Sequence, residues 1–150
     1  MQVSDFKTEM WSMSYQIKAN MQKFIVPIIQ TEGLSMHQAY ILIGLLEGSF
    51  TNISSLCKEL GVNQGNVSTM CKNMEKSGLL ERNRSREDER VVNLSLTDKG
   101  RDTIQRLLSK ADQFDDIFEQ IPIEKLEAII NGMHEFSELL KILSNNTTIQ

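Results

Sequence analysis

The residues best suited to a chemical task lie in a short charged segment past the middle of the chain, RNRSREDER. Arg84, Arg86 and Arg90 each carry a guanidinium group, which forms charge-assisted hydrogen bonds to phosphate oxygens. A loop that holds such groups together can lie on a phosphate backbone and insert an arginine into a narrow minor groove. The segment therefore predicts contact with nucleic acid, and a solvated charged turn is the competing interpretation.

The same segment also holds acidic residues, which would repel a polyanion. Glu87, Asp88 and Glu89 follow one another directly between Arg86 and Arg90. We expect Asp88 to pair with Arg90 or with a nearby arginine and so to hold the loop in shape. Its role would then be positioning rather than net attraction.

A second polar set lies on a helix just before this segment. Val67, Met70, Cys71 and Met74 cluster on one side of a helical wheel at about 100° per residue. The other sides offer amides and hydroxyls near the N-terminal end, lysines further along, and one lateral carboxylate. Amides and hydroxyls suit base edges in the major groove, and lysines suit phosphates. The predicted contact residues are Gln64, Asn66, Ser68, Thr69, Lys72 and Lys76. A helix whose polar face is merely solvated is the alternative.

Two short helical patterns with a tight break position these side chains. The first has an apolar stripe between Ile53 and Leu60 and ends at Gly61. Asn63 can cap the second, which Gly78 closes. The lengths and the turn residues are typical of a helix-turn-helix unit.

The hydrophobic period then changes from 3.6 to 2. Leu79–Asn83 predicts a short strand, and Val92–Leu96 predicts a half-buried one. The charged segment lies between them as the loop of a hairpin. Thr97 can cap a third long helix, whose apolar face runs to Ile121 before Pro122 breaks it.

Long helices are predicted on both sides of this central part. An apolar stripe from Phe6 to Ile28 indicates the first helix, with Pro27 near its end. Ser35 and Gln38 form a capping box for a helix that is apolar nearly all round, so this helix should be central and buried. A last stripe runs from Leu126 to Leu143.

Composition sets limits on the class of protein. The 150 residues carry a net charge of −4, but the segment from residue 53 to residue 95 has seven basic and six acidic residues, so the acidity lies in the flanks. The longest apolar run is far below the roughly 20 residues of a membrane span. The N-terminus lacks a basic segment followed by an apolar one, and there are only two cysteines, Cys57 and Cys71. We therefore expect a cytoplasmic protein.

The segment SSLCKELGVNQGNVSTMCKNMEKSGLLERNRSREDERVVNLSLTDKG resembles the winged helix-turn-helix of the MarR family of bacterial transcription regulators. The similarity covers about a third of the chain and includes Asp88-x-Arg90, the signature of the family's hairpin loop, which is called the wing. The order of helices around it fits as well. Glu89 departs from the pattern, since the family often has a basic residue there.

The resemblance implies a homodimer in which the first and the last two helices of the protomers interlock. Our candidates for that interface are Phe6, Met10, Phe136, Leu140 and Leu143. It also implies binding of double-stranded DNA at a pseudo-palindrome, with half-sites about one helical turn apart. The family often binds small amphipathic acids or phenols, which loosen DNA binding. Trp11, His37 and Tyr40 are candidate liners, each of which ordinary packing would also explain, so the effector-binding residues are unknown.

The sequence gives less support to other functions. The sequence has no phosphate-cradling glycine loop, no nucleophile elbow and no metal-binding His-Glu motif, so neither an enzyme nor a metal or cofactor site is predicted. One branch of the family senses oxidants through a cysteine in its first helix, where this chain has none. Cys57 and Cys71 fall on apolar stripes, so buried packing is the simpler interpretation. A winged helix that binds protein instead of DNA remains a second alternative.

The sequence thus predicts a mainly α fold with a small β-hairpin wing, made of a winged helix-turn-helix and long N- and C-terminal dimerisation helices. In one domain of residues 1–150, residues 35–99 would bind DNA, while residues 1–34 and 100–150 would form the dimer. The predicted function is a homodimeric, sequence-specific transcription regulator, most simply a repressor that a small effector releases.

Overall fold

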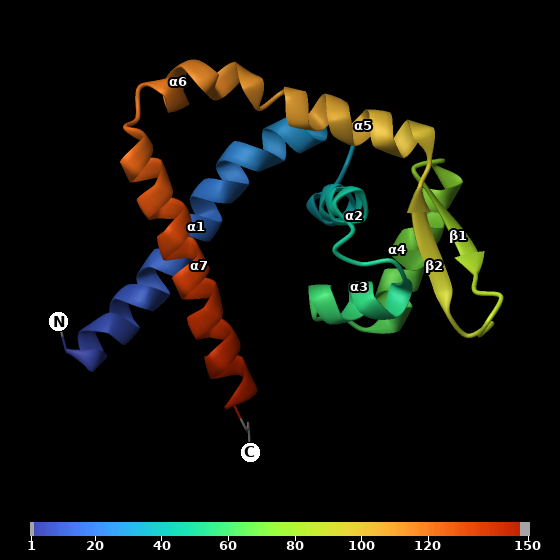
Figure 1. The fold of residues 1–150 in the computed structure, drawn as a ribbon, viewed down its shortest axis with the longest axis horizontal. Helices are drawn as coiled ribbons and strands as arrows, with labels where there is room; N and C mark the ends of the chain where they lie inside the picture. Colours follow the sequence, from blue (N-terminus) through green and yellow to red (C-terminus); the bar gives the residue numbers. More distant parts are fainter. Residues whose placement is uncertain (1, 148–150) are drawn as a thin grey trace. The chain divides into compact units, whose positions relative to one another are not determined.

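The structure is a computed structural model that describes residues 2–147, so both ends of the predicted dimerisation regions lie outside the described residues. The chain is mostly helical with one antiparallel hairpin (Figure 1). The predicted fold class is confirmed. The elements are α1 (Val3–Gln30), α2 (Met36–Glu47), α3 (Ile53–Leu60), α4 (Gln64–Lys76), β1 (Leu80–Arg84), β2 (Val92–Leu96), α5 (Asp98–Ser109), the 3₁₀ helix η1 (Asp112–Phe114), α6 (Asp115–Glu119) and α7 (Ile123–Asn145).

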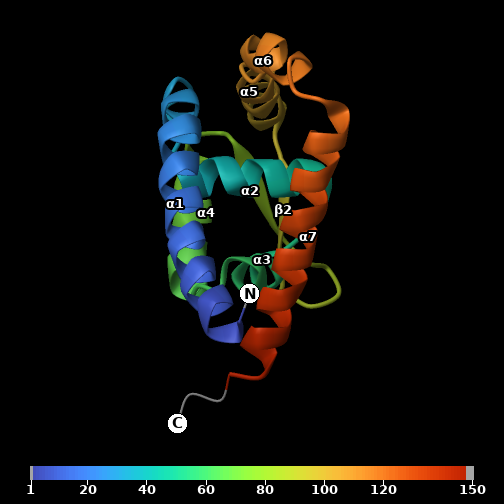
Figure 2. The same ribbon diagram turned by 90° about the vertical axis from the view of Figure 1, so that its left-hand side faces the viewer.

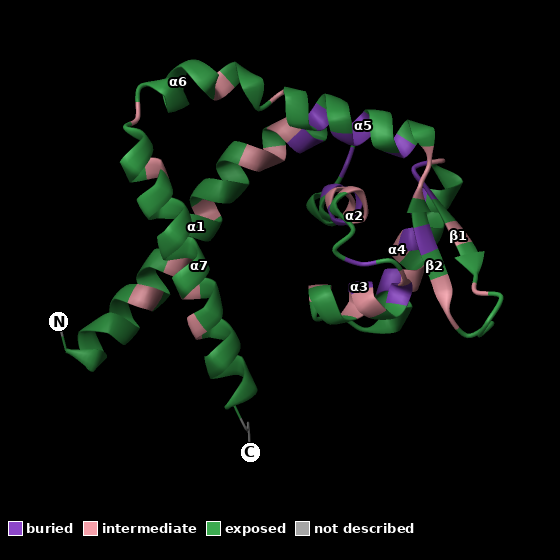
Figure 3. Cartoon of the chain, viewed as in Figure 1, coloured by how far each residue is buried: buried purple, intermediate pink, exposed green. Residues whose placement is uncertain are grey.

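Contacts within the chain define two compact units that divide after Lys110. The first unit contains α1 to α5 and both strands, and the second contains η1, α6 and α7. Among residues 2–147, all of the buried hydrophobic residues belong to the first unit, as the purple segments of Figure 3 show. The first unit therefore has its own core, while α7 has no buried residue among those described.

Helix α2 lies at the centre of the first unit, as its all-round apolar sequence predicted. Ala39, Ile41 and Leu42 are at most 1% exposed. Figure 2 shows α2 with α5 above it and α3 below it, and α2 also contacts β2. The fully buried side chains of α3 and α4 join the same core, and these are Leu56, Val67, Cys71 and Met74.

The ends of the helices follow the predicted capping residues. Ser35 and Gln38 form the capping box of α2, and the Asn63 side chain accepts a hydrogen bond from the Asn66 amide at 3.0 Å. Gly48 and Gly61 both have positive φ, the left-handed conformation that ends α2 and α3. A capping box of Asn52 and Ser55 at the start of α3 was not predicted, although Asn and Ser at this spacing are suitable residues.

The hairpin pairs Leu80 with Leu96, Arg82 with Leu94 and Arg84 with Val92. The first strand begins one residue later than predicted, at Leu80, and the second matches its predicted range. Strand β2 also meets the start of α3, because the Leu94 amide donates to the Thr51 carbonyl at 2.9 Å. The hairpin is thus anchored on both sides of β2 and projects beside α4 (Figure 1).

The predicted third long helix, from Thr97 to Ile121, was wrong in its length. Helix α5 ends at Ser109, and η1 and α6 follow as separate short helices. Aspartate is a weak helix former, and negative charge is unfavourable at a helix C-terminus, so Asp112, Asp115 and Asp116 oppose continuation. The apolar spacing continues across the break, which is why periodicity alone suggested one helix.

The start of α5 is fixed on the junction between α4 and β1. Thr97 accepts from the Gly100 amide at 2.9 Å and donates to the Gly78 carbonyl at 2.5 Å. A Cβ atom at Gly100 would lie 1.9 Å from the carbonyl oxygen of Leu79, so only glycine fits there. This close approach sets the direction in which α5 leaves the hairpin.

The end of α1 is tied to α5 by a cluster around Glu32. Its carboxylate accepts from Arg106 Nη2 at 3.0 Å and from Lys110 Nζ at 2.5 Å, and Lys110 also donates to Thr31. These hydrogen bonds lower the pKa of Glu32, with that from Lys110 the largest cause. We call Thr31, Glu32, Arg106 and Lys110 the Glu32 cluster.

Apolar side chains remain exposed along α1 and α7. The stripe predicted on α1 is present on a helix that continues through Pro27, but Phe6, Met13 and Ile17 are 37–47% exposed. On α7 the exposed apolar residues are Ile123, Ile129, Ile130, Met133, Leu140, Ile142 and Leu143. None of the helices within residues 2–147 is both long enough and apolar enough to span a membrane.

Candidate nucleic-acid interface

Helix α4 presents a polar outer face because its apolar face is locked into the core. Val67, Cys71 and Met74 are fully buried, which fixes the rotation of the helix about its axis. The predicted contact residues therefore point outward: Gln64, Asn66, Thr69, Lys72 and Lys76 are exposed, and Ser68 is half-buried.

The N-terminal half of this face combines hydrogen-bonding side chains with a glycine, which has no side chain of its own. The Thr69 hydroxyl donates to the Gly65 carbonyl at 3.0 Å, so its oxygen remains available as an acceptor. Gly65 is exposed, and a Cβ atom there would meet only Asn63 Oδ1, at an ordinary 3.5 Å. No close contact within residues 2–147 requires glycine at this position, and the missing side chain leaves room for a partner to approach the helix.

The wing is a loop that its own short polar side chains hold in shape. The Ser85 amide donates to the Val91 carbonyl at 2.9 Å, which closes the hairpin. Ser85 Oγ accepts from the Glu87 amide at 3.2 Å, and Asp88 Oδ1 accepts from the Arg90 amide at 2.9 Å. Side-chain bonds of this type stabilise tight turns.

The contact of Asp88 differs in kind from the expected ion pair. Its carboxylate binds the backbone amide of Arg90, and none of the ion pairs found within residues 2–147 involves Asp88. The guanidinium groups of Arg84, Arg86 and Arg90 are exposed and extend from the hairpin and its loop. Asp88 can thus shape the loop without neutralising an arginine, and its wing-shaping role stays a prediction.

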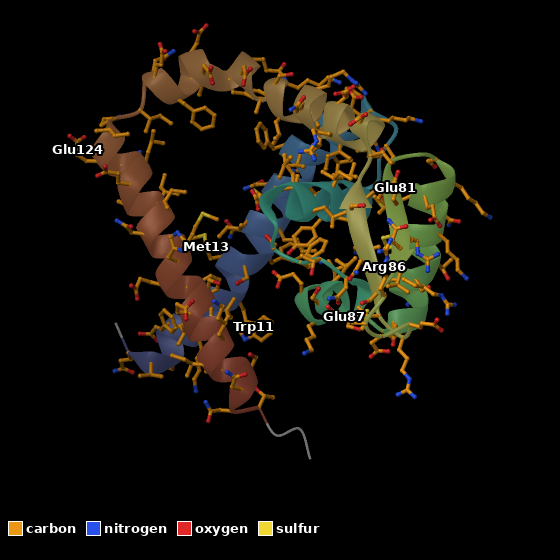
Figure 4. All side chains as sticks on the ribbon, turned by 45° about the vertical axis from the view of Figure 1, so that its right-hand side comes forward. Trp11, Met13, Glu81, Arg86, Glu87 and Glu124 are labelled. Atoms are coloured by element: carbon orange, nitrogen blue, oxygen red, sulfur yellow. The ribbon has the colours of Figure 1, made fainter. Side chains whose placement is uncertain are left out.

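Two carboxylates of the wing also face solvent. Glu87 and Glu89 are exposed, and Figure 4 labels Glu87 and its neighbour in the sequence, Arg86. Glu81 lies further back on β1, opposite Ser95. The wing therefore mixes charges, as the sequence indicated, and its attraction for a polyanion depends on which side chains approach it.

Sequence reasoning overlooked one charged residue beside this interface. The side chain of Arg82 on β1 is only 16% exposed, and its Nη1 lies 3.5 Å from Glu75 Oε2 on α4. The alternation of side chains along the strand could have revealed this, because Arg82 lies on the same face as Leu80 and is paired with Leu94. An arginine at an inward strand position is unusual enough to mark.

The two cysteines are free thiols in the first unit. Cys71 is fully buried, and this burial raises its pKa to about 11, although the positive charge of Arg82 acts in the opposite direction. Since the thiolate is the species that reacts with oxidants, the Cys71 thiol is poorly suited to sensing. Cys57 is half-buried on α3.

The candidate effector liners are in different settings. Tyr40 donates a hydrogen bond to Glu59 at 3.2 Å, and its pKa is raised, first by desolvation and then by this bond. Trp11 is 74% exposed on α1 (Figure 4), and His37 is exposed at the start of α2. No residue group within 2–147 combines three or more His, Cys, Asp and Glu side chains in a way that could hold a metal ion. The effector-binding residues remain unassigned.

Known proteins similar to this chain are transcription regulators. The sequence profile of the SarA/Rot transcriptional regulators matches residues 23–107, more than half of the chain. The organic hydroperoxide resistance transcriptional regulator of Bacillus subtilis is 33% identical over 86 residues, 57% of this chain and 58% of that protein. The regulator MgrA of Staphylococcus aureus is 36% identical over 84 residues, 56% of each chain. The matched part thus spans little more than half the length of these curated relatives.

Solved structures share the fold over nearly the whole chain. A MarR family protein from Bacillus stearothermophilus superposes with a TM-score of 0.77 at 20% identity, covering 94% of this chain and 99% of that one. The transcriptional repressor CouR, bound to a 23-mer DNA duplex, gives 0.74 at 20% identity, with 91% and 98% covered. Staphylococcus aureus MarR in complex with salicylate and kanamycin gives 0.76 at 19% identity, with 90% and 92% covered.

Proposed function

Because the chain belongs to the SarA/Rot family of transcriptional regulators and has the winged-helix fold of the MarR regulators, we propose that it is a homodimeric repressor that binds DNA sequence-specifically. The observation that carries this proposal is the pairing of two surfaces in one compact unit. The outer face of α4 offers amides, hydroxyls and lysines, and the adjoining wing exposes three arginines.

Two kinds of contact would contribute to DNA binding, one to affinity and the other to specificity. Lys72, Lys76 and the three wing arginines would bind phosphates, which gives affinity that falls as salt rises. The side chains at the N-terminal half of α4 would read base edges in the major groove and give specificity. These residues are Gln64, Asn66, Ser68 and Thr69.

A dimer is proposed because the apolar stripes of α1 and α7 are exposed in a single chain. Side chains such as Phe6 and Leu140 cost free energy when they are left in water, and a second copy would cover them. Two copies related by a two-fold axis would read half-sites about 34 Å apart, the length of one helical turn of DNA. CouR, a repressor of the same fold, was solved bound to a 23-mer DNA duplex, which supports the DNA-binding part of the proposal.

Release by a small amphipathic or phenolic effector is proposed as the regulatory step. The MarR protein from Staphylococcus aureus was solved with salicylate, an amphipathic phenolic acid. We call α4 the recognition helix, because it would read the base edges. Such a ligand would act by favouring a dimer whose two recognition helices are wrongly spaced for the operator. We further propose that the protein acts in the cytoplasm and as a regulator rather than as an enzyme.

A gel-shift experiment tests the proposal. The protein would be mixed at low salt with a duplex from the region next to its own gene and with a scrambled duplex of equal length. The expected result is a sequence-selective shift that weakens steeply as salt is raised. A folded dimer that shifts neither duplex would refute DNA binding and favour the rival interpretation, a winged helix that binds protein.

A further inference from the structure

Arg82 occupies a position where a charged side chain is unusual. It points inward from β1, opposite the buried Leu94, and only 16% of its side chain is exposed. Moving a guanidinium group out of water costs free energy unless its hydrogen bonds are replaced. A positive charge on the inner face of β1 therefore calls for a functional explanation.

The contacts of Arg82 replace its hydration only in part. Its Nη1 lies 3.5 Å from Glu75 Oε2, and its Nε is buried without a hydrogen-bond partner. A pair with such long and incomplete contacts is a poor source of stability, since an apolar pair of similar volume would serve better. What the pair does supply is a fixed relation between two elements, because Glu75 belongs to α4 and Arg82 to β1.

These two elements carry the two halves of the proposed DNA interface. Glu75 lies next to Lys76 on α4, and Arg82 lies two residues before Arg84, where the strand enters the wing. A shift of α4 against β1 would change the distance between the recognition helix and the wing. Both halves could then no longer meet the same duplex in register.

We propose that Arg82 is a positioning residue for DNA binding, which acts with Glu75 to fix the recognition helix α4 against the strand that leads into the wing. The DNA-binding part of this inference rests on the proposed function. The part that concerns α4 and β1 does not, so the two can be tested separately.

Glu75→Gln is the decisive variant because two explanations predict opposite signs. If only net charge mattered, removing a carboxylate near the interface would tighten DNA binding. If the pair positions α4, the same change weakens binding, with a rise in Kd of about tenfold. Glu75 is 41% exposed, so the variant should fold.

Glu81→Gln is the matched control. Glu81 is adjacent to Arg82 on β1 but is exposed and lies on the other face of the strand, opposite Ser95 (Figure 4). The substitution changes the net charge by the same amount and leaves the pair of Glu75 and Arg82 intact. Its DNA binding should equal that of the wild type or be slightly tighter.

A second measurement needs no DNA. Cys71 is fully buried on the inner face of α4, one turn before Glu75, so its reaction with a thiol reagent reports on how often α4 moves away. In a Cys57→Ser background, Glu75→Gln and Arg82→Gln should speed the labelling of Cys71 several-fold. Glu81→Gln should leave the rate unchanged.

The outcomes distinguish the positioning role of Arg82 from the proposed DNA-binding function. If the wild type binds no DNA but the variants label Cys71 faster, the proposed function is refuted, and only the part of the inference that concerns α4 and β1 is upheld. An unchanged labelling rate in Glu75→Gln would overturn the proposal, as would tighter DNA binding by this variant. Weaker binding by Arg82→Gln combined with tighter binding by Glu75→Gln would also overturn it, because Arg82 would then contact DNA itself.

Discussion

At the scale of single residues, the wing is where contact with DNA and simple solvation can be told apart. Arg90→Ala should weaken operator binding about three- to tenfold. It should also reduce the slope of log K against log salt by about 0.9, the value for one phosphate contact. The backbone amide of Arg90, which binds Asp88, is retained, so the loop should keep its shape. Titrations at several salt concentrations measure both quantities.

The neighbouring acid supplies the control for this prediction. Glu89→Gln removes an exposed carboxylate from the same loop and should tighten binding modestly. If Arg90→Ala changed neither the affinity nor the slope, the wing would be only a solvated turn.

Gly65 allows a prediction in which two measurements change in opposite directions. Gly65→Ala should raise the free energy of unfolding by up to about 1 kcal/mol, because alanine is the better helix former and space exists for its Cβ. The same methyl group should weaken DNA binding by keeping the duplex away from α4. Urea unfolding and a gel shift on one preparation measure the two effects.

Gly132→Ala on α7 is the comparison, since a Cβ there would meet nothing within 4 Å and is therefore also tolerated. It should stabilise the protein without changing DNA binding. Equal DNA affinity of Gly65→Ala and wild type would show that nothing approaches the backbone at Gly65.

The spacing of residue types predicted which side chains of α4 are exposed, but it did not predict the contacts between residues. The exposed face of α4 follows from the buried spacing of Val67, Cys71 and Met74. The bond from Asp88 to a backbone amide, and the pair of Arg82 with Glu75, depend on how the loop turns and on how α4 packs on β1. Distances between elements of this kind cannot be obtained from spacing along a sequence.

At the scale of elements, the Glu32 cluster ties α1 to α5 and should make their association sensitive to acid. Hydrogen bonds from Lys110 and Arg106 lower the pKa of Glu32 below its ordinary value of 4.5. A lowered carboxyl pKa stabilises the folded state fully above the ordinary value, and this contribution is lost as pH falls through the lowered value. The Tm of wild type should therefore exceed that of Glu32→Gln at pH 6.

Thermal unfolding at a series of pH values tests this sign. The Tm difference between wild type and Glu32→Gln should shrink as pH falls below 4.5 and vanish once Glu32 is protonated in the folded state. A difference that persisted unchanged at acid pH would mean that the charge of Glu32 does not support the contact.

Helix boundaries were predictable where capping residues mark them and not elsewhere. Ser35, Asn63 and Thr97 each accept a hydrogen bond at a helix start, as their types indicated. The break after Ser109 has neither glycine nor proline to mark it. Lys110, at this break, donates a hydrogen bond to Glu32, 78 residues earlier in the chain. A helix boundary that depends partly on such a distant contact cannot be predicted from the local sequence pattern.

At the scale of the whole molecule, the proposed dimerisation would decide whether two α4 helices act together on one DNA duplex. Leu140→Asp would place a charge in the exposed apolar stripe of α7, where Leu140 is 43% exposed in the single chain. A fully buried leucine contributes about 1.5–3 kcal/mol, so the dimer dissociation constant should rise more than about tenfold. Sedimentation analysis should show monomers, and operator binding should weaken with them.

Asn131→Asp is the control on the same helix. Asn131 precedes Leu140 by nine residues, about two and a half helical turns, and so lies on the opposite side of α7. It adds the same charge and should leave the dimer intact. A Leu140→Asp protein that remained dimeric would exclude this stripe from the interface.

The hairpin also bears on how the protein avoids aggregation through the edge of its sheet. Strand β2 is paired with β1 on one side and bonded to Thr51 on the other, so β1 is the strand within residues 2–147 that has an unpaired outer edge. Unpaired edges can template the growth of sheets between molecules, and short, charged strands resist this. Strand β1 has five residues, and three of them, Glu81, Arg82 and Arg84, are charged. These charges should therefore keep molecules of this protein from aggregating through the edge of β1 in a crowded solution.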